Sequence, residues 1–192
     1  MIRIRFAMND AEPKKSKRVK VKRSPLELAA MMLSVRPLSR TELKKKLHDK
    51  ELPWEIAEQT VLECERLGFV NDPETAEAYV RSMRNRGDGS RKIRTRLRLR
   101  GFKKDDVENA FQRDNEASER SETEVALSVL NRRRLTLERE DNILKRKNKA
   151  LRMLASKGFP ADAAYKALDL FFGRADKFEL EEEDYPREEQ SC

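Results

Sequence analysis

The sequence predicts an all-α protein, an elongated array of three tandem three-helix repeats with about nine helices. Three observations support this fold class. Apolar residues make up 38% of the 192 residues and charged residues 41%, a balance that suits small units burying a thin stripe against their neighbours better than one thick core. Helix-start signals recur along the chain, and one helix–turn–helix pattern occurs three times.

The first repeat is expected at residues 24–70 and should hold three helices. Ser24–Glu27 (SPLE) supplies an N-cap, a proline in the first turn and a glutamate three residues after the cap. Ser39–Glu42 (SRTE) repeats the capping signal for a second helix. Pro53 opens a third, whose apolar residues recur at three- and four-residue steps until Gly68 ends it.

The second repeat is expected at residues 71–114. Asp72–Pro73 gives the cap-plus-proline signal for its first helix. The break at Gly87–Gly89 leads into a second helix that Gly101 ends, and a short third helix follows through Val107–Phe111.

The third repeat is expected at residues 115–174, and its first residues belong to a polar link over Arg113–Ser121. Its helices should be centred on Ala126–Leu130, on a long apolar stripe over Ile143–Leu154, and on Ala164–Phe171. None of these segments has the alternation of a strand.

An internal repeat supports these boundaries. Leu47–Pro53 aligns with Leu97–Lys103 and Leu154–Pro160, and the match continues into the next helix at the same offsets of 50 and then 57 residues. The matched positions are Ala57, Val107 and Ala164; Thr60, Ala110 and Ala167; and Val61, Phe111 and Leu168. Glycine occupies two of the three turns, where positive φ favours it, and Glu51 is the departure.

The charge distribution predicts a polyanionic partner. Residues 1–23 should form a flexible arm with seven basic residues between positions 13 and 23, and residues 175–192 an acidic tail. The net charge is +8, and removing the −6 of the last fourteen residues leaves +14 on the rest. Nucleic acid is the commonest polyanion in a cytoplasm. The alternative to a polyanionic partner is that these charges only keep the helical surface solvated.

Fifteen basic residues are the candidate partner- or nucleic-acid-binding residues. Three of them, Arg91, Arg94 and Arg98, share one helical face and are expected to point away from Ile93 and Leu97. Phe102, Phe111, Phe159 and Phe171 fall on repeat-core positions, so contacts should be made mainly to phosphates, without base readout. The full set is Arg81, Arg84, Arg86, Arg91, Lys92, Arg94, Arg96, Arg98, Arg100, Arg132, Arg133, Arg134, Lys145, Lys149 and Arg152.

No motif for catalysis or for a bound group is present in the sequence. The one histidine, His48, is expected to be a polar surface residue, and no Cys or His cluster has zinc spacing. A phosphate-binding glycine loop is also absent, so we expect no catalytic residue, metal or cofactor. With no apolar run of 18 residues and no signal peptide, we expect a cytoplasmic monomer without membrane contact.

A set of residues spread over all three repeats forms a recognisable family pattern. It consists of Gly68–Asp72 (GFVND), Ala76–Val80 (AEAYV), Arg84, Gly87, Gly89, Arg91, Ile93, Leu97 and Arg100–Phe102 (RGF), with Ser39, Glu42, Leu43 and Leu47 before them and Lys147, Ala150, Leu154 and Lys157–Phe159 (KGF) after them. These residues resemble those of the RecX regulatory proteins of bacteria. The resemblance covers residues 25–172 and is strongest over 68–102.

This resemblance implies three tandem three-helix repeats and a modulator of the RecA recombinase in DNA repair and recombination. Such a protein lies along the groove of the recombinase–DNA filament and usually inhibits strand exchange, ATP hydrolysis and coprotease activity. The implied partners are the RecA filament and single- or double-stranded DNA. Two alternatives stay open: a general DNA-binding or nucleoid protein, and a helical scaffold whose charges only solvate it.

Overall fold

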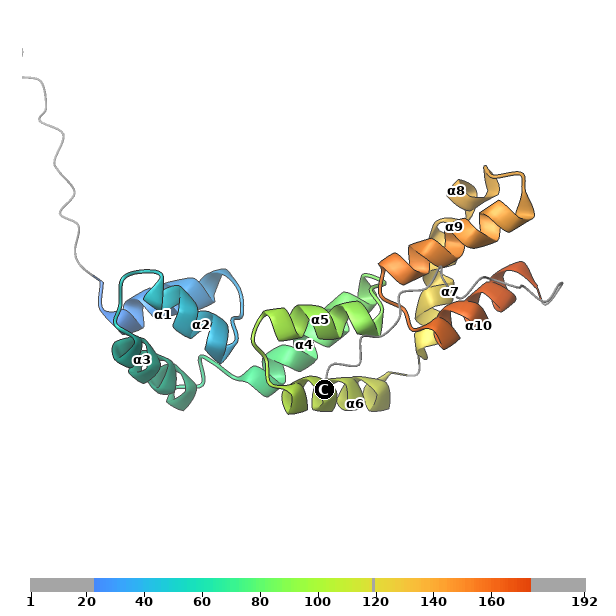
Figure 1. Ribbon diagram of the computed structural model, residues 1–192. Coiled ribbons are helices and arrows are strands. Elements are labelled where there is room, and N and C mark those ends of the chain that lie inside the picture. Colours follow the sequence, from blue (N-terminus) through green and yellow to red (C-terminus); the bar gives the residue numbers. More distant parts are fainter. Residues whose placement is uncertain (1–22, 119, 174–192) are drawn as a thin grey trace, which may run out of the picture.

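The structure is a computed structural model that describes residues 23–118 and 120–173, and these form an elongated, all-helical array (Figure 1). The nine expected helices are present, together with a short tenth helix, α8, and the all-α fold class is confirmed for the described residues. The helices are α1 (Pro25–Val35), α2 (Arg40–His48), α3 (Trp54–Arg66), α4 (Asp72–Asn85), α5 (Ser90–Leu99), α6 (Lys104–Ala117), α7 (Glu122–Arg132), α8 (Arg134–Glu138), α9 (Ile143–Ser156) and α10 (Ala161–Phe172). The acidic tail, and the basic arm apart from Arg23, lie outside these residues.

Three separate hydrophobic clusters hold the array together. In each unit the outer helices pack against each other, α1 on α3, α4 on α6 and α7 on α10, with α2, α5 or α9 as the middle helix. The clusters lie within residues 29–70, 76–111 and 125–168. All nine positions matched by the internal repeat are buried, none more than 7% exposed. The repeat pattern therefore reports the core of each unit.

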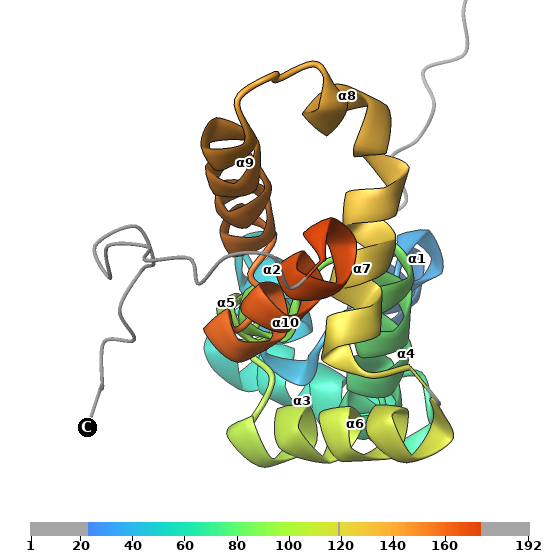
Figure 2. The ribbon, with the colours of Figure 1, turned by 90° about the vertical axis from the view of Figure 1, so that its right-hand side faces the viewer.

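The third unit differs most from the sequence-based expectation. Helix α8 follows α7 almost directly. When the array is viewed end-on, α8 and the start of α9 lie together at the end of the unit that is farther from α10 (Figure 2). Ile143 and Leu144 were expected on the apolar stripe of α9, but they are 48% and 58% exposed. They occupy the first turn of α9, and only the later residues Ala150, Leu151 and Leu154 belong to the core of the unit.

Two local expectations in the second unit were wrong. Helix α6 continues to Ala117, so residues 113–117 are helical and do not form a polar link. The N-cap of α4 is Asn71, whose side chain accepts a hydrogen bond from the Glu74 N–H at 3.2 Å. The carboxylate of Asp72 instead accepts a hydrogen bond from the Arg40 N–H of α2 at 2.9 Å, which joins the first two units.

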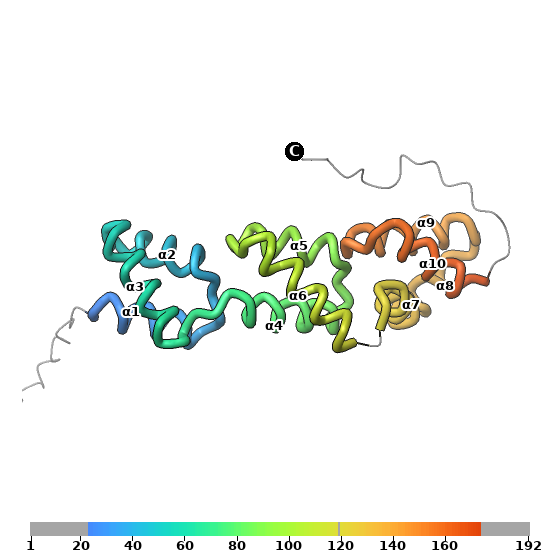
Figure 3. The backbone as a smooth tube through the Cα atoms, turned by 90° about the horizontal axis from the view of Figure 1, so that it is seen from below, coloured from blue at the N-terminus to red at the C-terminus, as the bar shows by residue number. Residues whose placement is uncertain are grey.

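The middle helices stack end to end along one side of the array, in the order α2, α5, α9 (Figure 3). At the second junction the Gly89 N–H donates to the Lys157 carbonyl at 2.8 Å, and the Arg91 N–H donates to the Gly158 carbonyl at 3.0 Å. At the first junction the Ser39 hydroxyl donates to the Arg100 carbonyl. Free carbonyls at one helix end thus meet free donors at the next helix start, and the helix dipoles align head to tail.

The turns at these junctions explain where the repeat requires glycine. Gly101 and Gly158 have φ of +78° and +79°, and an added Cβ would come within 2.6 Å of Thr41 and 2.4 Å of Lys92, respectively. Glu51 takes the same left-handed conformation, with φ of 67°, at the outer end of the first unit. No described unit precedes it and its side chain is exposed, so a residue other than glycine fits there.

Replacement of glycine at the junction turn should destabilise the protein through the contact between units. We expect Gly158→Ala to lower the free energy of unfolding by more than Gly68→Ala does. Gly68 has a φ of +72° with no atom within 4 Å of an added Cβ, so alanine there costs only the left-handed conformation, about 1–2 kcal/mol. At Gly158 the backbone of Lys92 must also move. Urea denaturation measures both costs, and equal values would contradict the junction contact.

Candidate nucleic-acid and partner interface

Charge is segregated among the helices. The middle helices α2, α5 and α9 carry four, five and five Lys or Arg residues and one acidic residue, Glu42. Helices α3 and α6 together carry nine acidic and three basic residues. The middle helices lie end to end on one side (Figure 3), so the helices richest in Lys and Arg are gathered along that side. We call helices α2, α5 and α9 the basic row.

The basic row is long enough to follow an extended polyanion. Its helices contain 9, 10 and 14 residues, which together span about 50 Å at 1.5 Å per residue. Phosphates of one DNA strand repeat at about 3.4 Å, so this length matches about 15 nucleotides. None of the three helices contains a Phe, Tyr or Trp residue, and the surface therefore offers charge without a base-stacking platform.

The structure divides the fifteen candidate residues between two regions. Exposed side chains on the basic row are Arg96, Arg98, Lys145, Lys149 and Arg152, with Arg91 and Lys92 half-buried at the start of α5. The ammonium of Lys92 pairs with Asp88 at 2.7 Å. Exposed side chains at the ends of α4 and α7 and the start of α8 are Arg81, Arg86, Arg132, Arg133 and Arg134.

Arg94 and Arg100 are held by carboxylates within the protein. Nε and Nη2 of Arg94 each donate to the carboxylate of Glu108 at 3.0 Å, and the guanidinium lies 4.0 Å from the Phe111 ring centroid. The hydrogen bond from Arg94 lowers the pKa of Glu108. Arg94 thus folds back over α6, contrary to the expectation that it points away from the core. Arg100 pairs at 3.2 Å with Glu42 of the first unit.

Burial of Glu42 would by itself raise the pKa of this carboxyl group. Hydrogen bonds from Arg36 and Arg100 outweigh that effect, and the pKa of Glu42 is lowered. The carboxylate in the ion pair across the first junction therefore stays charged to lower pH than an unpaired glutamate does.

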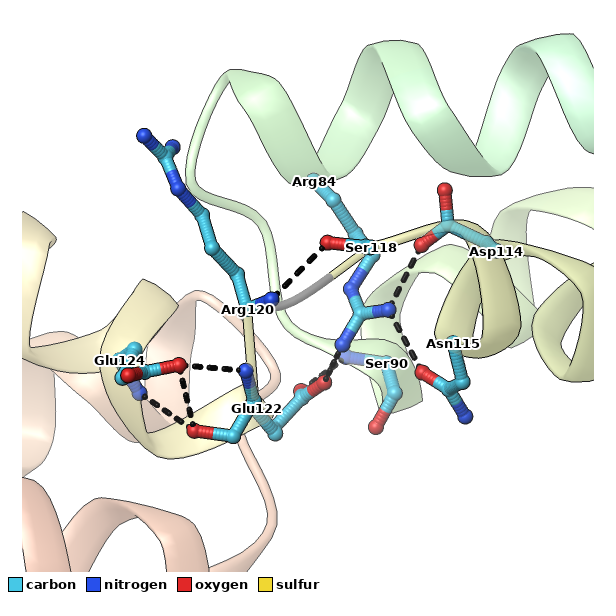
Figure 4. Close-up of polar contacts among 9 residues, drawn as sticks. Arg84, Ser90, Asp114, Asn115, Ser118, Arg120, Glu122 and Glu124 are labelled. Carbon is cyan, nitrogen blue, oxygen red and sulfur yellow. Dashed lines mark hydrogen bonds and ion pairs between the residues drawn. The ribbon is translucent and has the colours of Figure 1, made fainter.

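Arg84 is not a surface residue: it is 8% exposed and lies at the centre of an ion-pair network (Figure 4). Its Nη1 donates to Asp114 at 2.6 Å and to Asn115 at 2.8 Å, and its Nη2 donates to Glu122 at 3.2 Å. The carboxylate of Glu122 also accepts the Ser90 N–H at 2.7 Å. The network joins α4 to α6, α7 and the start of α5, so the assignment of Arg84 to a partner surface was wrong.

Sequence reasoning missed the contribution of the first unit to the basic row. Lys45 is exposed and Lys46 half-buried on α2, the first helix of the basic row. The available signal was the run Lys44–Lys46 inside a predicted helix, at the repeat position that corresponds to the arginine-rich helix. The other clusters drew attention because they hold more arginine.

The described residues offer little chemistry apart from charge. They include no group of three or more His, Cys, Asp or Glu residues placed to hold a metal ion, and none of their helices is long and apolar enough to cross a membrane. His48, expected at the surface, is half-buried: its ring stacks on Trp54 at 3.9 Å between centroids, and Nδ1 lies 3.0 Å from the Leu52 carbonyl oxygen.

Comparison with known proteins identifies the family of this chain. Family models described as the second and third three-helix domains of RecX match residues 71–110 and 121–168. The regulatory protein RecX of Thermobifida fusca is 32% identical over 136 residues, which cover 70% of this chain and 71% of that relative. The chain belongs to the RecX family. A RecX protein of Deinococcus radiodurans is 29% identical over 163 residues, which cover 83% of this chain and 75% of the relative.

Solved RecX structures share the fold. The crystal structure of RecX from Lactobacillus salivarius has a TM-score of 0.66 at 21% identity and covers 77% of this chain and 94% of its own. A second crystal structure of a regulatory protein RecX has a TM-score of 0.66 at 22% identity, with 76% and 71% covered. In this chain the match to the second RecX domain contains α4, α5 and half of α6, and the match to the third runs from α7 into α10.

The buried network predicts a large stability difference between two nearby arginines. Arg84→Ala leaves Asp114 buried without its cation, and we expect the free energy of unfolding to fall by about 3–5 kcal/mol. Arg86→Ala removes an exposed side chain two residues later and should change it by less than about 0.5 kcal/mol. Chemical denaturation of both variants makes the comparison. A similar small effect for both would show that the Arg84 network does not hold the units together.

Proposed function

We propose that this RecX-family protein regulates the RecA recombinase by binding along the recombinase–DNA filament, as an inhibitor of strand exchange, ATP hydrolysis and coprotease activity. The family membership supports the assignment. The observation that carries it is the basic row, three helices rich in Lys and Arg that lie end to end along one side of the three units. The proposed setting is the cytoplasm, with the protein acting as a monomer.

Binding through the basic row would be electrostatic and insensitive to sequence. Exposed ammonium and guanidinium groups on it, such as Lys45, Arg98 and Lys145, make no ion pair with a described residue and are available to phosphates or acidic protein surface. The acidic helices α3 and α6 would face away from such a partner, because like charges across an interface oppose binding. The charge distribution thus favours one orientation of the array on a filament.

The stacked middle helices supply the rigidity that such a regulator needs. Backbone hydrogen bonds at the α5–α9 junction and the Arg84 network fix the second unit against the third. Glu42 and Arg100 join the first unit to the second. A rigid, elongated ligand loses little conformational entropy on binding and would hinder movements of the filament subunits that it spans.

A general DNA-binding or nucleoid protein is the second candidate. The same basic row favours it, since phosphates on naked DNA would attract these side chains equally well. The two functions differ in what the recombinase adds to the affinity, because a filament offers contacts with protein in addition to phosphates.

Charge reversal on the basic row tests both candidates. The variant Lys45→Glu/Arg98→Glu/Lys145→Glu changes one exposed residue on each middle helix, and we expect it to lose inhibition of the recombinase while its circular dichroism stays helical. If the three residues contact phosphates, the slope of log affinity for single-stranded DNA against log salt should become shallower by about 2. The matched control, Lys104→Glu/Arg139→Glu/Lys166→Glu, changes exposed residues off the row and should keep inhibition.

Salt titrations with and without the recombinase separate the candidates. For the unchanged protein, binding to the recombinase–DNA filament should persist at salt that already releases it from naked single-stranded DNA, because protein contacts add to the phosphate contacts. Parallel titration curves with no additional affinity in the presence of the recombinase would refute filament regulation and leave the general DNA-binding function.

A further inference from the structure

A cleft of about 250 Å³ lies where the second unit meets the third. Helices α4 and α7 form its sides, and the end of α6 with the following link closes it. Figure 3 shows α4 and α7 on the side of the array away from the basic row. The polar groups that matter for its chemistry are Arg81, Arg84, Ser118, Arg120, Ser128 and Arg132.

Three arginines around this cleft have no counter-ion among the described residues. The side chains of Arg81, Arg120 and Arg132 are exposed and make no hydrogen bond or ion pair with any described residue. Other arginines of the array, such as Arg94 within the second unit and Arg100 at the first junction, are paired with glutamates. Like charges around one cleft repel, and a bound anion would remove that repulsion.

The described acidic groups nearest to the cleft offset only part of these three charges. Asp114, which also lines the cleft, and Glu122 both pair with the guanidinium of Arg84, so this group of three residues carries one net negative charge against three unpaired arginines. Nε of Arg84 is buried and has no acceptor within the described structure. The wall of the cleft is therefore short of acceptors even where carboxylates are present.

The hydroxyl groups show which additional donor is free. Ser128 donates its hydroxyl hydrogen to the Val125 carbonyl at 2.7 Å. Ser118 accepts a hydrogen bond from the Arg120 N–H at 3.2 Å, which leaves its own hydrogen for a ligand (Figure 4). Ser118 and Arg120 therefore place a free hydroxyl hydrogen and an unpaired guanidinium along the same cleft.

We propose that this cleft binds a phosphate group. A carboxylate has two oxygens, and one arginine satisfies both, as Arg94 does for Glu108. Three guanidinium groups and a hydroxyl group offer more donors than a carboxylate can accept, whereas a phosphate accepts bidentate contacts from several arginines. The volume is below the range of about 300–1,000 Å³ for whole small-molecule ligands, so the cleft holds one phosphate group of a larger or a free ligand.

Two sources could present this phosphate: a DNA strand, in which case the inference rests on the proposed function, or a free phosphate compound. The test uses Arg81→Gln/Arg132→Gln, with Arg139→Gln/Lys166→Gln as a control that removes two exposed charges elsewhere. Melting temperatures are measured in sodium phosphate, sodium acetate and sodium chloride at matched ionic strength and pH. Binding to a fluorescent single-stranded oligonucleotide is measured against salt for the same proteins.

We expect phosphate, but not acetate, to raise the melting temperature of the unchanged protein above its value in chloride, because a ligand of the native state stabilises it. The rise should disappear in the cleft variant and persist in the control. If the cleft variant is poorly folded in chloride, Arg120→Gln tests the same site from the link. The Lys45→Glu/Arg98→Glu/Lys145→Glu variant should keep the rise, which separates this site from the proposed function.

The oligonucleotide identifies the source of the phosphate. A salt slope that becomes shallower by about 0.7 in the cleft variant alone would assign one phosphate of a DNA strand to the cleft. An unchanged slope together with loss of the phosphate-dependent rise would assign a free phosphate compound. The proposal is overturned if phosphate gives no rise, if acetate gives an equal one, or if the cleft variant keeps it.

Discussion

The end-to-end contact between middle helices is the constraint on which the rest of the structure depends. Each junction places the C-terminal turn of one middle helix against the first residues of the middle helix in the preceding unit. This contact requires glycine at positions 101 and 158, brings three basic helices into one row, and fixes the acidic outer helices on other sides. A looser junction would leave the same three cores intact but would not align their charges.

Local signals in the sequence identified the helices and their cores, because caps, turns and apolar spacing act over a few residues. Ser24 and Ser39 are N-caps, and Leu97 is completely buried, as expected. Contacts between distant residues were beyond such signals. Arg84 looked like its exposed neighbours, and only the fold brings Asp114 and Glu122 to it from 30 and 38 residues away. The basic row was likewise only partly visible, since nothing local shows that three separate helices share one side.

Because the basic and acidic helices lie on different sides, the electric field of a charged partner would orient the array. The basic row would be attracted to a polyanion while α3 and α6 are repelled by it, so long-range electrostatics would orient the protein before any contact forms. The arginines that pair internally serve a different purpose, because Arg84, Arg94 and Arg100 hold helices or units together. Counting basic residues alone therefore overestimates the charge available to a partner.

The turn at Glu51 has a consequence for self-association. A head-to-tail contact that repeats without closing generates fibres when it forms between separate molecules. The junctions of this array are contacts of that kind, and an added Cβ at either glycine would come within 2.6 Å of the helix start it faces. Glu51 carries a full side chain at the equivalent turn, where φ is 67°. A second copy of the protein could therefore not bring a helix start as close to this turn as the glycine turns allow, which disfavours end-to-end polymerisation through a copy of the internal junction.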